Sequence, residues 1–349
     1  MTILPETMNL NPVAQSAQFI YENSEYVSVN LENVEKFCQK LEADINNVPF
    51  NYLNWSFHEL NPNPNFKNAL EWIFLVDSLN FSFWSDLEIN NDINYIKKYK
   101  YGVLYKGKIY QGYWSLPAVI NRALDNGIDL LNFNTILSMT NEELKQLFYS
   151  DYSLIEPYPP LIEERIFVMK QISFVMISKY NNKVENLIQK GNKDAIQLMT
   201  IITQDFNCFK DQCEFLGKTV QFNKRAQIFI ADVAAYLEYK NLGEFNNINQ
   251  ITMFPDYRVP QTLLKLEILK YNDKLMNKLI QNEAIDYGQL EEIEIRGNSI
   301  WAVELIIQQL NKKFNLNAIK IDFYLWEYAQ HYKLHSSNYP IHRTRSIYY

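Results

Sequence analysis

The chain has few of the residues on which the common cofactor and metal motifs depend. Only nine of its 349 residues are glycine, and neither a GxGxxG nor a P-loop pattern occurs, which argues against a dinucleotide or nucleoside triphosphate site. The three cysteines, Cys38, Cys208 and Cys213, provide neither a disulfide framework nor a zinc ligand set, and they favour a reducing compartment. Among the four histidines, His331 and His335 have the spacing of a metal pair on a helix, but we interpret them as a solvated helix end. We therefore expect no metal and no cofactor.

A basic surplus and long apolar runs are also absent. The net charge is −7, from 40 acidic and 33 basic residues, whereas a protein that grips a polynucleotide backbone usually carries excess positive charge. No stretch approaches the ~18 consecutive apolar residues of a membrane span, and the N-terminus lacks a cationic segment followed by an apolar run. We expect a cytoplasmic protein without a polynucleotide or membrane partner. Its 47% hydrophobic and 15% aromatic content indicates extensive burial.

Hydrophobic periodicity predicts a mainly helical chain. Residues 31–45 place their apolar side chains on one helical stripe. The capping box Thr140 to Glu143 predicts the start of another helix. The longer helices that we expect cover residues 161–190, 222–239, 260–281, 299–313 and 321–332.

One segment departs from the helical pattern, and one breaker divides the chain. Aromatic and apolar residues alternate along 101–114 on either side of Lys106-Gly107, which predicts a β-hairpin. The proline-rich stretch 156–160 is the clearest breaker. We therefore predict an N-terminal helical lobe with the hairpin, residues 1–155, and a C-terminal helical lobe, residues 156–349.

Aromatic side chains gather directly after an apolar run. Phe81, Phe83 and Trp84 lie next to Asn80. Either they cover the core at a helix end, as buried aromatic residues commonly do, or they form a flat slot for a base, where stacking contributes ~1–3 kcal/mol. Both interpretations remain open from the sequence.

Charged residues stand within two further hydrophobic segments. Lys224 lies near the start of the segment 222–237 and shares a helical face with Asp232. The alternative to a functional role is a snorkelling lysine and an aspartate paired with a neighbouring base. The segment 294–304 predicts a helix that opens near Gly297, with Arg296 just outside it and Trp301 within it.

Asp256 lies in a stiff turn between Pro255 and Pro260, and we expect Pro260 to be the first residue of the following helix. A carboxylate held in such a turn is suited to stabilise a developing cation. The alternative is a helix N-cap, with the carboxylate bonded to backbone N–H groups and Arg258 as its ion partner. Residue spacing alone favours the N-cap interpretation.

Eight stretches, in one order along nearly the whole chain, resemble the sequences of one known family. They are FHELNP (57–62), LNFSFW (79–84), GYWSLPAVINRALDNGI (112–128), KRAQIFIAD (224–232), ITMFPDYRVPQ (251–261), EIRGNSIWAVE (294–304), IDFYLWEYA (321–329) and IHRTRSIYY (341–349). The family is that of the queuosine salvage proteins, which are queuosine 5′-monophosphate N-glycosylases.

The resemblance implies a helical fold similar to the helix-hairpin-helix DNA glycosylases, with both lobes in one integrated catalytic unit. The implied reaction is hydrolysis of the base–ribose bond of free queuosine 5′-monophosphate, which releases queuine for reuse in tRNA. The catalytic residues that it implies are Asp256, as the carboxylate, and Lys224, as its cationic companion. The implied substrate-binding residues are His58, Asn80, Phe81, Phe83, Trp84, Arg258 and Trp301. His58 would line the ribose–phosphate side and the aromatic residues the base, in a protein expected to be a monomer.

The chemistry suits these residue types. Cleavage of the C1′–N bond passes through an oxocarbenium-like centre, which an adjacent carboxylate stabilises while water attacks. Two functions of other classes remain open. A non-catalytic carrier of modified nucleobases or nucleotides would share the aromatic slot, and a glycosylase acting on tRNA or DNA would show a steep salt dependence.

Overall fold

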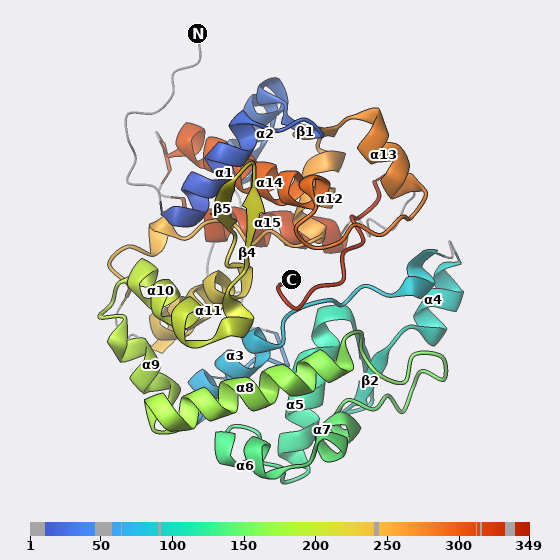
Figure 1. Ribbon diagram of the computed structural model, residues 1–349, viewed down its shortest axis with the longest axis vertical. Coiled ribbons are helices and arrows are strands. Elements are labelled where there is room, and N and C mark those ends of the chain that lie inside the picture. The colour runs from blue at the N-terminus through green and yellow to red at the C-terminus, as the bar shows by residue number, and fades with distance from the viewer. Residues whose placement is uncertain are drawn as a thin grey trace. The chain divides into compact units, whose positions relative to one another are not determined.

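The computed structural model describes residues 11–45, 58–63, 65–89, 92–240, 244–311, 313–314, 316–331 and 339–349, without the side chains of residues 44, 45, 93, 238–240, 330 and 331. Phe57, His335 and the side chain of His331 therefore lie outside the described residues. The structure is mainly helical, as predicted (Figure 1). None of the described helices is long and apolar enough to cross a membrane.

Two compact units make up the chain. Unit 1 comprises Met1–Asn51, Asp211–Gln227 and Asn247–Thr344, and unit 2 comprises Tyr52–Lys210, Ile228–Asn246 and Arg345–Tyr349. The division differs from the lobes 1–155 and 156–349 expected from the sequence, because the N-terminal helices pack with C-terminal ones inside unit 1. Each unit therefore collects segments that are far apart in the sequence.

Unit 1 is built around one long helix, α14 (Leu290–Leu310), which packs most extensively against α1 (Pro12–Glu22) (Figure 1). Its other helices are α2 (Leu31–Ile45), α12 (Arg258–Lys265), α13 (Asp273–Ile280), α15 (Ala318–His331), the 3₁₀ turn η5 (Ile248–Gln250) and the start of α11 (Lys224–Lys240). The helices expected at 31–45, 222–239 and 321–332 are confirmed.

The prediction that a helix opens near Gly297 is wrong. Helix α14 already begins at Leu290, so Gly297 and Arg296 lie well inside it. A Cβ atom at Gly297 would lie only 2.5 Å from Cγ2 of Ile20 on α1, so the glycine is required by close helix packing and does not mark a helix end. From the sequence alone, such a glycine is easily taken for a helix end.

The prediction of one helix over 260–281 is also wrong. Helix α12 ends at Lys265, Glu267 has a positive φ of 55°, and the chain then forms strand β6 (Leu269–Tyr271). Strand β6 pairs antiparallel with β1 (Val27–Val29), in the register Ser28 to Lys270. The strand exists because a distant segment supplies its hydrogen-bond partners, which local periodicity does not report.

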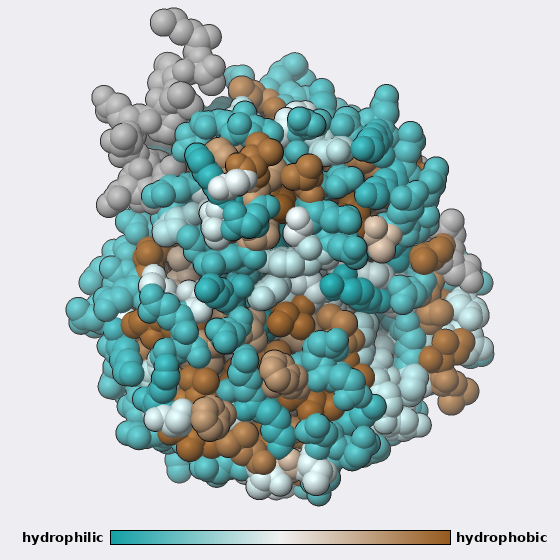
Figure 2. All heavy atoms as spheres, viewed as in Figure 1, coloured by the Kyte–Doolittle hydropathy of each residue, from teal (hydrophilic) through white to brown (hydrophobic). Residues whose placement is uncertain are grey.

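Unit 2 contains the other helices that the structure describes, including most of α11. They are α3 (Ala69–Ser78), α4 (Ile93–Tyr99), α5 (Ser115–Asp125), α6 (Phe133–Ser138), α7 (Asn141–Leu147), α8 (Ile162–Tyr180), α9 (Val184–Lys190), α10 (Ala195–Asp205), most of α11, and the 3₁₀ turns η2 (Asp86–Ile89), η3 (Gly112–Trp114) and η4 (Asn207–Phe209). The ring of Phe74 on α3 contacts those of Phe206, Phe209 and Phe229, with centroids 5.2–5.9 Å apart, and these rings form part of the core. On the face drawn in Figure 2, hydrophilic residues cover most of the surface.

Two local predictions in unit 2 have different outcomes. The helix predicted over 161–190 is interrupted, because Asn181 and Asn182 have positive φ angles of 51° and 59° and end α8. The capping box at Thr140 is confirmed, since its side chain accepts the Glu143 N–H at 3.2 Å and the Glu143 carboxylate accepts the Thr140 N–H at 2.7 Å.

The predicted hairpin is confirmed, and unit 1 contains a second one. Strands β2 (Gly102–Tyr105) and β3 (Lys108–Gln111) pair across Lys106-Gly107, both with positive φ as in a type I′ turn. Strands β4 (Gln212–Phe215) and β5 (Lys218–Gln221) pair in the same way across Leu216-Gly217. This second hairpin was not predicted, although a glycine followed by lysine marks both turns.

Candidate active site

Asp256 in unit 1 lies at the end of a loop, 251–256, that leads into α12. Its Oδ1 accepts the backbone N–H of Arg258 at 2.7 Å and that of Val259 at 2.9 Å. These are the bonds of a helix N-cap. Helix α12 begins at Arg258, so the expectation that Pro260 is its first residue is wrong, although Pro260 still lies in the first turn, where its missing N–H costs nothing. The carboxylate is therefore fixed by the helix that it caps.

Two buried side chains, each on a different helix, form hydrogen bonds to the backbone of the same loop. Oε1 of Gln227 on α11 accepts the Thr252 N–H at 2.9 Å. Nε of Arg296 on α14 donates to the carbonyl oxygen of Pro255 at 3.0 Å. Gln227 and Arg296 are both fully buried, so these bonds are shielded from competition with water. The peptide immediately before Asp256 is thus anchored to the core of unit 1.

Arg296 belongs to a buried ionic network that also reaches Lys224. Its Nη1 and Nη2 donate to the two carboxylate oxygens of Asp211 at 3.0 and 2.6 Å, and Nη1 also donates to Glu292 at 3.2 Å. Oδ2 of Asp211 accepts the backbone N–H of Lys224 at 3.3 Å. Because a paired and hydrogen-bonded ion is stable in the core while an unpaired one is not, this network holds the start of α11 and the Asp256 loop together.

Lys224 carries a buried ammonium group, and burial disfavours its charged form. The side chain is 4% exposed, and burial lowers its pKa from 10.5 to about 8. The negative charge of Asp256 is the largest influence in the opposite direction. Lys224 consequently stays mostly protonated at neutral pH and lies within the electrostatic reach of Asp256.

A second carboxyl group, Asp322 on α15, belongs to the same cluster. It is 5% exposed, and its Oδ1 accepts the N–H of Phe254 at 2.9 Å. Burial, reinforced by the negative charge of Asp256, raises the pKa of Asp322 well above its usual value, while the Phe254 N–H and Lys224 act against this. Asp322 lies within one of the stretches that resemble the family, but no role was predicted for it. The available signal was an acid placed directly between two apolar residues, Ile321 and Phe323.

Two further residues predicted to bind substrate also lie in unit 1. Nη1 of Arg258 donates to Oε1 of Gln261 at 3.2 Å, and its guanidinium lies 5.1 Å from the ring centroid of Tyr257. Trp301 is 4% exposed and packs against Tyr21, with ring centroids 5.9 Å apart. Their roles toward substrate stay predictions.

His58, in unit 2, is held flat against a tryptophan. Its ring stacks on that of Trp114 with centroids 3.3 Å apart and planes at 8°. Nδ1 accepts the backbone N–H of Leu60 at 3.3 Å, so the neutral ring carries its proton on Nε2. Burial lowers the pKa of His58 below its usual value, which favours this neutral form. Trp114 thus orients a predicted site residue, although Trp114 itself was not predicted to belong to the site.

The predicted aromatic slot is largely enclosed within unit 2. Phe81 is fully buried, Asn80 is 8% exposed and Trp84 is 3% exposed. The guanidinium of Arg165 on α8 lies 4.4 Å from the ring centroid of Phe81 and donates to the carbonyl oxygen of Leu79 at 2.6 Å. These contacts favour the core interpretation for Phe81, and its contact with a base stays a prediction.

The C-terminal residues of unit 2 pack on the same segment. The guanidinium of Arg345 lies 3.3 Å from the ring centroid of Trp84 and donates to its carbonyl oxygen at 2.7 Å. The Ser82 N–H donates to the carbonyl oxygen of Tyr349 at 3.0 Å. One face of Trp84 is therefore covered by an arginine.

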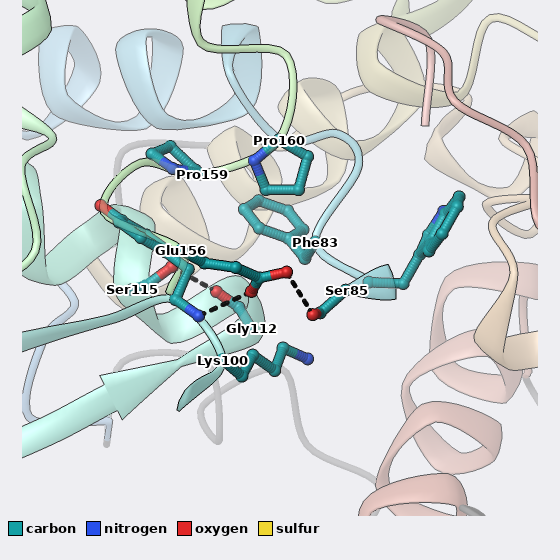
Figure 3. Close-up of a pocket in the computed structure, with 10 residues that line it drawn as sticks. Phe83, Ser85, Lys100, Gly112, Ser115, Glu156, Pro159 and Pro160 are labelled. Carbon is teal, nitrogen blue, oxygen red and sulfur yellow. Dashed lines mark hydrogen bonds between the residues drawn. The ribbon is translucent and has the colours of Figure 1, made fainter. Parts of the chain in front are cut away.

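A small pocket lies beside Phe83, the half-buried member of the predicted slot (Figure 3). Glu156 accepts the hydroxyl proton of Ser85 at 2.5 Å and the backbone N–H of Tyr101 at 2.9 Å, and the Phe83 ring lies by Pro160. The interior has room for about one water molecule, far less than a nucleobase requires. The hydrogen bonds of Glu156 therefore anchor the segment that carries Phe83, and the pocket is too small to be a base site.

Among the residues that the structure describes, no three His, Cys, Asp or Glu side chains gather as a metal site requires. The grouped ionisable side chains of unit 1 are instead Lys224, Asp256 and Asp322, held by the buried Arg296 network. A fixed carboxylate, an ammonium and a second carboxyl group are suited to stabilise positive charge and to move protons.

Comparison with known proteins gives one consistent result. Residues 60–349 match the family model described as queuosine salvage protein. A protein of Mus musculus named queuosine 5′-phosphate N-glycosylase/hydrolase is 40% identical over 344 residues, which cover 96% of this chain and 98% of that protein. Proteins of the same name from Schizosaccharomyces pombe and Dictyostelium discoideum are 37% and 28% identical, each over 97% of this chain and 100% of the relative.

Proposed function

The chain belongs to the queuosine salvage protein family, and from this premise we propose that it is an N-glycosyl hydrolase that cleaves the base–ribose bond of queuosine 5′-monophosphate. The products are queuine, available for salvage into tRNA, and ribose 5-phosphate. The structural observation that supports this most directly is the clamped Asp256 carboxylate beside the buried ammonium of Lys224. We also propose that the helices follow the helix-hairpin-helix DNA glycosylase fold.

Asp256 supplies the charge that the reaction needs. As the C1′–N bond breaks, positive charge develops at C1′ and on the ring oxygen of the ribose, and a fixed carboxylate lowers the energy of that state. Oδ1 is engaged by the two backbone N–H groups of α12, so Oδ2 is the oxygen that faces the reacting centre. Oδ2 receives one proton from the attacking water as the C1′–O bond forms, and the base leaves with the electron pair of the C1′–N bond and takes up one proton on that nitrogen. No rearrangement of the carboxylate is needed during the reaction.

Lys224 serves the polar side of the substrate. The Lys224 ammonium compensates the charge of Asp256 in the buried cluster and attracts the phosphate or ribose oxygens. A mononucleotide carries a single phosphate, which agrees with the net charge of −7.

The test is Asp256→Asn, with release of queuine from queuosine 5′-monophosphate followed by mass spectrometry and stability followed by thermal melting. Asparagine keeps Oδ1 and caps helices about as well as aspartate, so the melting temperature should change little. Loss of the charge should lower turnover ~100–1,000-fold, by analogy with the loss of one preorganised group in other enzymes.

Asp194 provides the matched control. It caps α10 with the same geometry, its Oδ1 accepting the N–H of Ile196 at 2.8 Å and of Gln197 at 2.9 Å. Asp194→Asn should leave turnover unchanged. A stable Asp256→Asn variant with more than about a tenth of the wild-type turnover would show that the charge is not catalytic, since a tenfold change is only ~1.4 kcal/mol.

Two outcomes would replace the proposal. Tight binding of queuine or the nucleotide by the wild-type protein, without product release over hours, would identify a carrier. Binding to tRNA or DNA that weakens steeply between 50 and 200 mM salt, together with base release from the polymer, would identify a glycosylase of polynucleotides.

A further inference from the structure

Helix α15 holds both sides of the junction at which Asp256 is placed. On the loop side, Oδ1 of Asp322 accepts the N–H of Phe254, two residues before Asp256, at 2.9 Å. On the helix side, the carbonyl oxygen of Leu325 accepts the hydroxyl proton of Thr262 on α12 at 3.2 Å. The loop and the helix that Asp256 caps are therefore both tied to one turn of α15. A shift of Asp322 would move the peptide that leads into Asp256.

The state of charge of this carboxyl group matters for its neighbours. Two ionised carboxylates beside one ammonium would compete for it, whereas a protonated acid leaves the ammonium of Lys224 to Asp256 alone. Burial and the charge of Asp256 both favour the protonated form of Asp322 and raise its pKa. Paired carboxyl groups whose environments separate their charge states are a recurring arrangement in active sites.

We propose that Asp322 is a positioning residue of the active site, which sets the placement of Asp256 through the 251–256 loop and acts on the Lys224–Asp256 pair as an uncharged acid. The inference rests on the proposed function and adds to it a third member of the ionisable cluster. Asp322 acts through Asp256 and is given no contact with substrate.

The charges around Asp322 come from several elements. Asp256 of the loop and Lys224 of α11 are the charged groups that shift its pKa. The helices packed against α15 add charged side chains whose influence is smaller. These are Arg258 and Lys265 on α12, and Glu291, Glu292, Glu294, Arg296 and Glu304 on α14. Helix α2 also approaches α15, with Lys40 5.7 Å from the ring centroid of Tyr328.

The experiment compares two replacements of Asp322 in the full chain. Asp322→Asn keeps the acceptor Oδ1 and is uncharged at every pH. Asp322→Leu keeps a similar volume but loses the acceptor. With queuosine 5′-monophosphate as substrate, we expect Asp322→Asn to keep kcat within about threefold of wild type. We expect Asp322→Leu to lower kcat at least tenfold with KM changed less than about threefold, because the loop moves while substrate binding residues stay in place.

Glu294 supplies the control for a purely structural carboxyl group. It is 2% exposed on α14, and its carboxylate accepts the backbone N–H of Glu25, Tyr26 and Val27. Glu294→Gln should change the melting temperature without changing kcat.

Melting temperature against pH tests the protonated state separately. The unfolded chain loses the Asp322 proton near the ordinary aspartate pKa of 3.8, whereas the native protein keeps it to higher pH. The free energy of unfolding of the wild-type protein therefore falls as pH rises above about 4. The Asp322→Asn variant has no ionisable group at this position, so its stability does not fall for this reason. We expect the melting temperature of Asp322→Asn minus that of wild type to grow between pH 4 and pH 8.

Three results would contradict the role proposed for Asp322. Equal loss of kcat in the Asn and Leu variants, wild-type kcat in the Leu variant, or a melting difference that does not grow with pH would each overturn the proposal. If the Leu variant does not fold, the Asn variant and the melting series still decide. A wild-type protein that releases no queuine would refute the proposed function instead, and the melting series would report on Asp322 independently of it.

Discussion

Replacing Lys224 by methionine should make the protein more stable and inactive at the same time. Methionine matches the length of the lysine stem but has no charge. Burial lowers the pKa of Lys224 from 10.5 to about 8, and this value already includes the attraction of Asp256. At pH 7 the native protein therefore holds an ammonium that water would hold more favourably. With ~1.4 kcal/mol for each pKa unit, the cost is on the order of 3 kcal/mol.

The assay is urea denaturation of both proteins at pH 7 and at pH 10. At pH 7 the free energy of unfolding of Lys224→Met should exceed that of wild type by up to about 3 kcal/mol. Between pH 8 and 10.5 the unfolded wild-type chain binds a proton at this lysine that the native state has lost, so wild-type stability rises with pH. The advantage of the variant should therefore shrink at pH 10.

An exposed lysine serves as the control. Lys313 pairs with Glu42 at 2.8 Å, and its side chain is 62% exposed. Lys313→Met should change the free energy of unfolding by less than about 1 kcal/mol at either pH. If Lys224→Met were less stable than wild type at pH 7, or kept the same advantage at pH 10, the buried charge would not be a source of strain. Full turnover in Lys224→Met would remove its catalytic role.

Two further predictions concern packing. Gly297→Ala should destabilise the protein by ~1–3 kcal/mol in urea denaturation, although alanine favours helices, because the new Cβ would lie 2.5 Å from the stiff side chain of Ile20. In a protein that also carries Ile20→Ala, the glycine replacement should be nearly neutral. If the glycine replacement cost the same with and without Ile20→Ala, the packing argument would be contradicted. Trp114→Ala should raise the pKa of His58 toward 6.5, measured by NMR titration, because the stacked ring contributes to its burial. Trp114→Phe should preserve most of the lowering, and an unchanged pKa in the Ala variant would show that Trp114 does not shield the histidine.

Family membership was accessible from the sequence because it depends on local patterns, and the family resemblance implied the catalytic roles of Asp256 and Lys224. Motifs in a fixed order identified the family, which the comparisons support over nearly the whole chain. The proline-flanked turn pointed to Asp256, and the lysine at the start of an apolar segment pointed to Lys224. The sequence left the N-cap and catalytic interpretations of Asp256 as alternatives. In the structure, the cap bonds are present and use Oδ1, which is compatible with a catalytic role for Oδ2.

Features that depend only on neighbouring residues could be predicted from the sequence. Apolar periodicity gave the helices at 31–45, 222–239 and 321–332, the Thr140 capping box gave a helix start, and Lys106-Gly107 gave a hairpin, because each depends on contacts within a few residues. Tertiary structure decided the rest. Strand β6 exists because β1 supplies its partner. Asp322 is tied to the loop of the candidate active site through a hydrogen bond to Phe254, 68 residues away in the sequence. Only the folded chain brings such groups out of water and together, and burial is what shifts their charge.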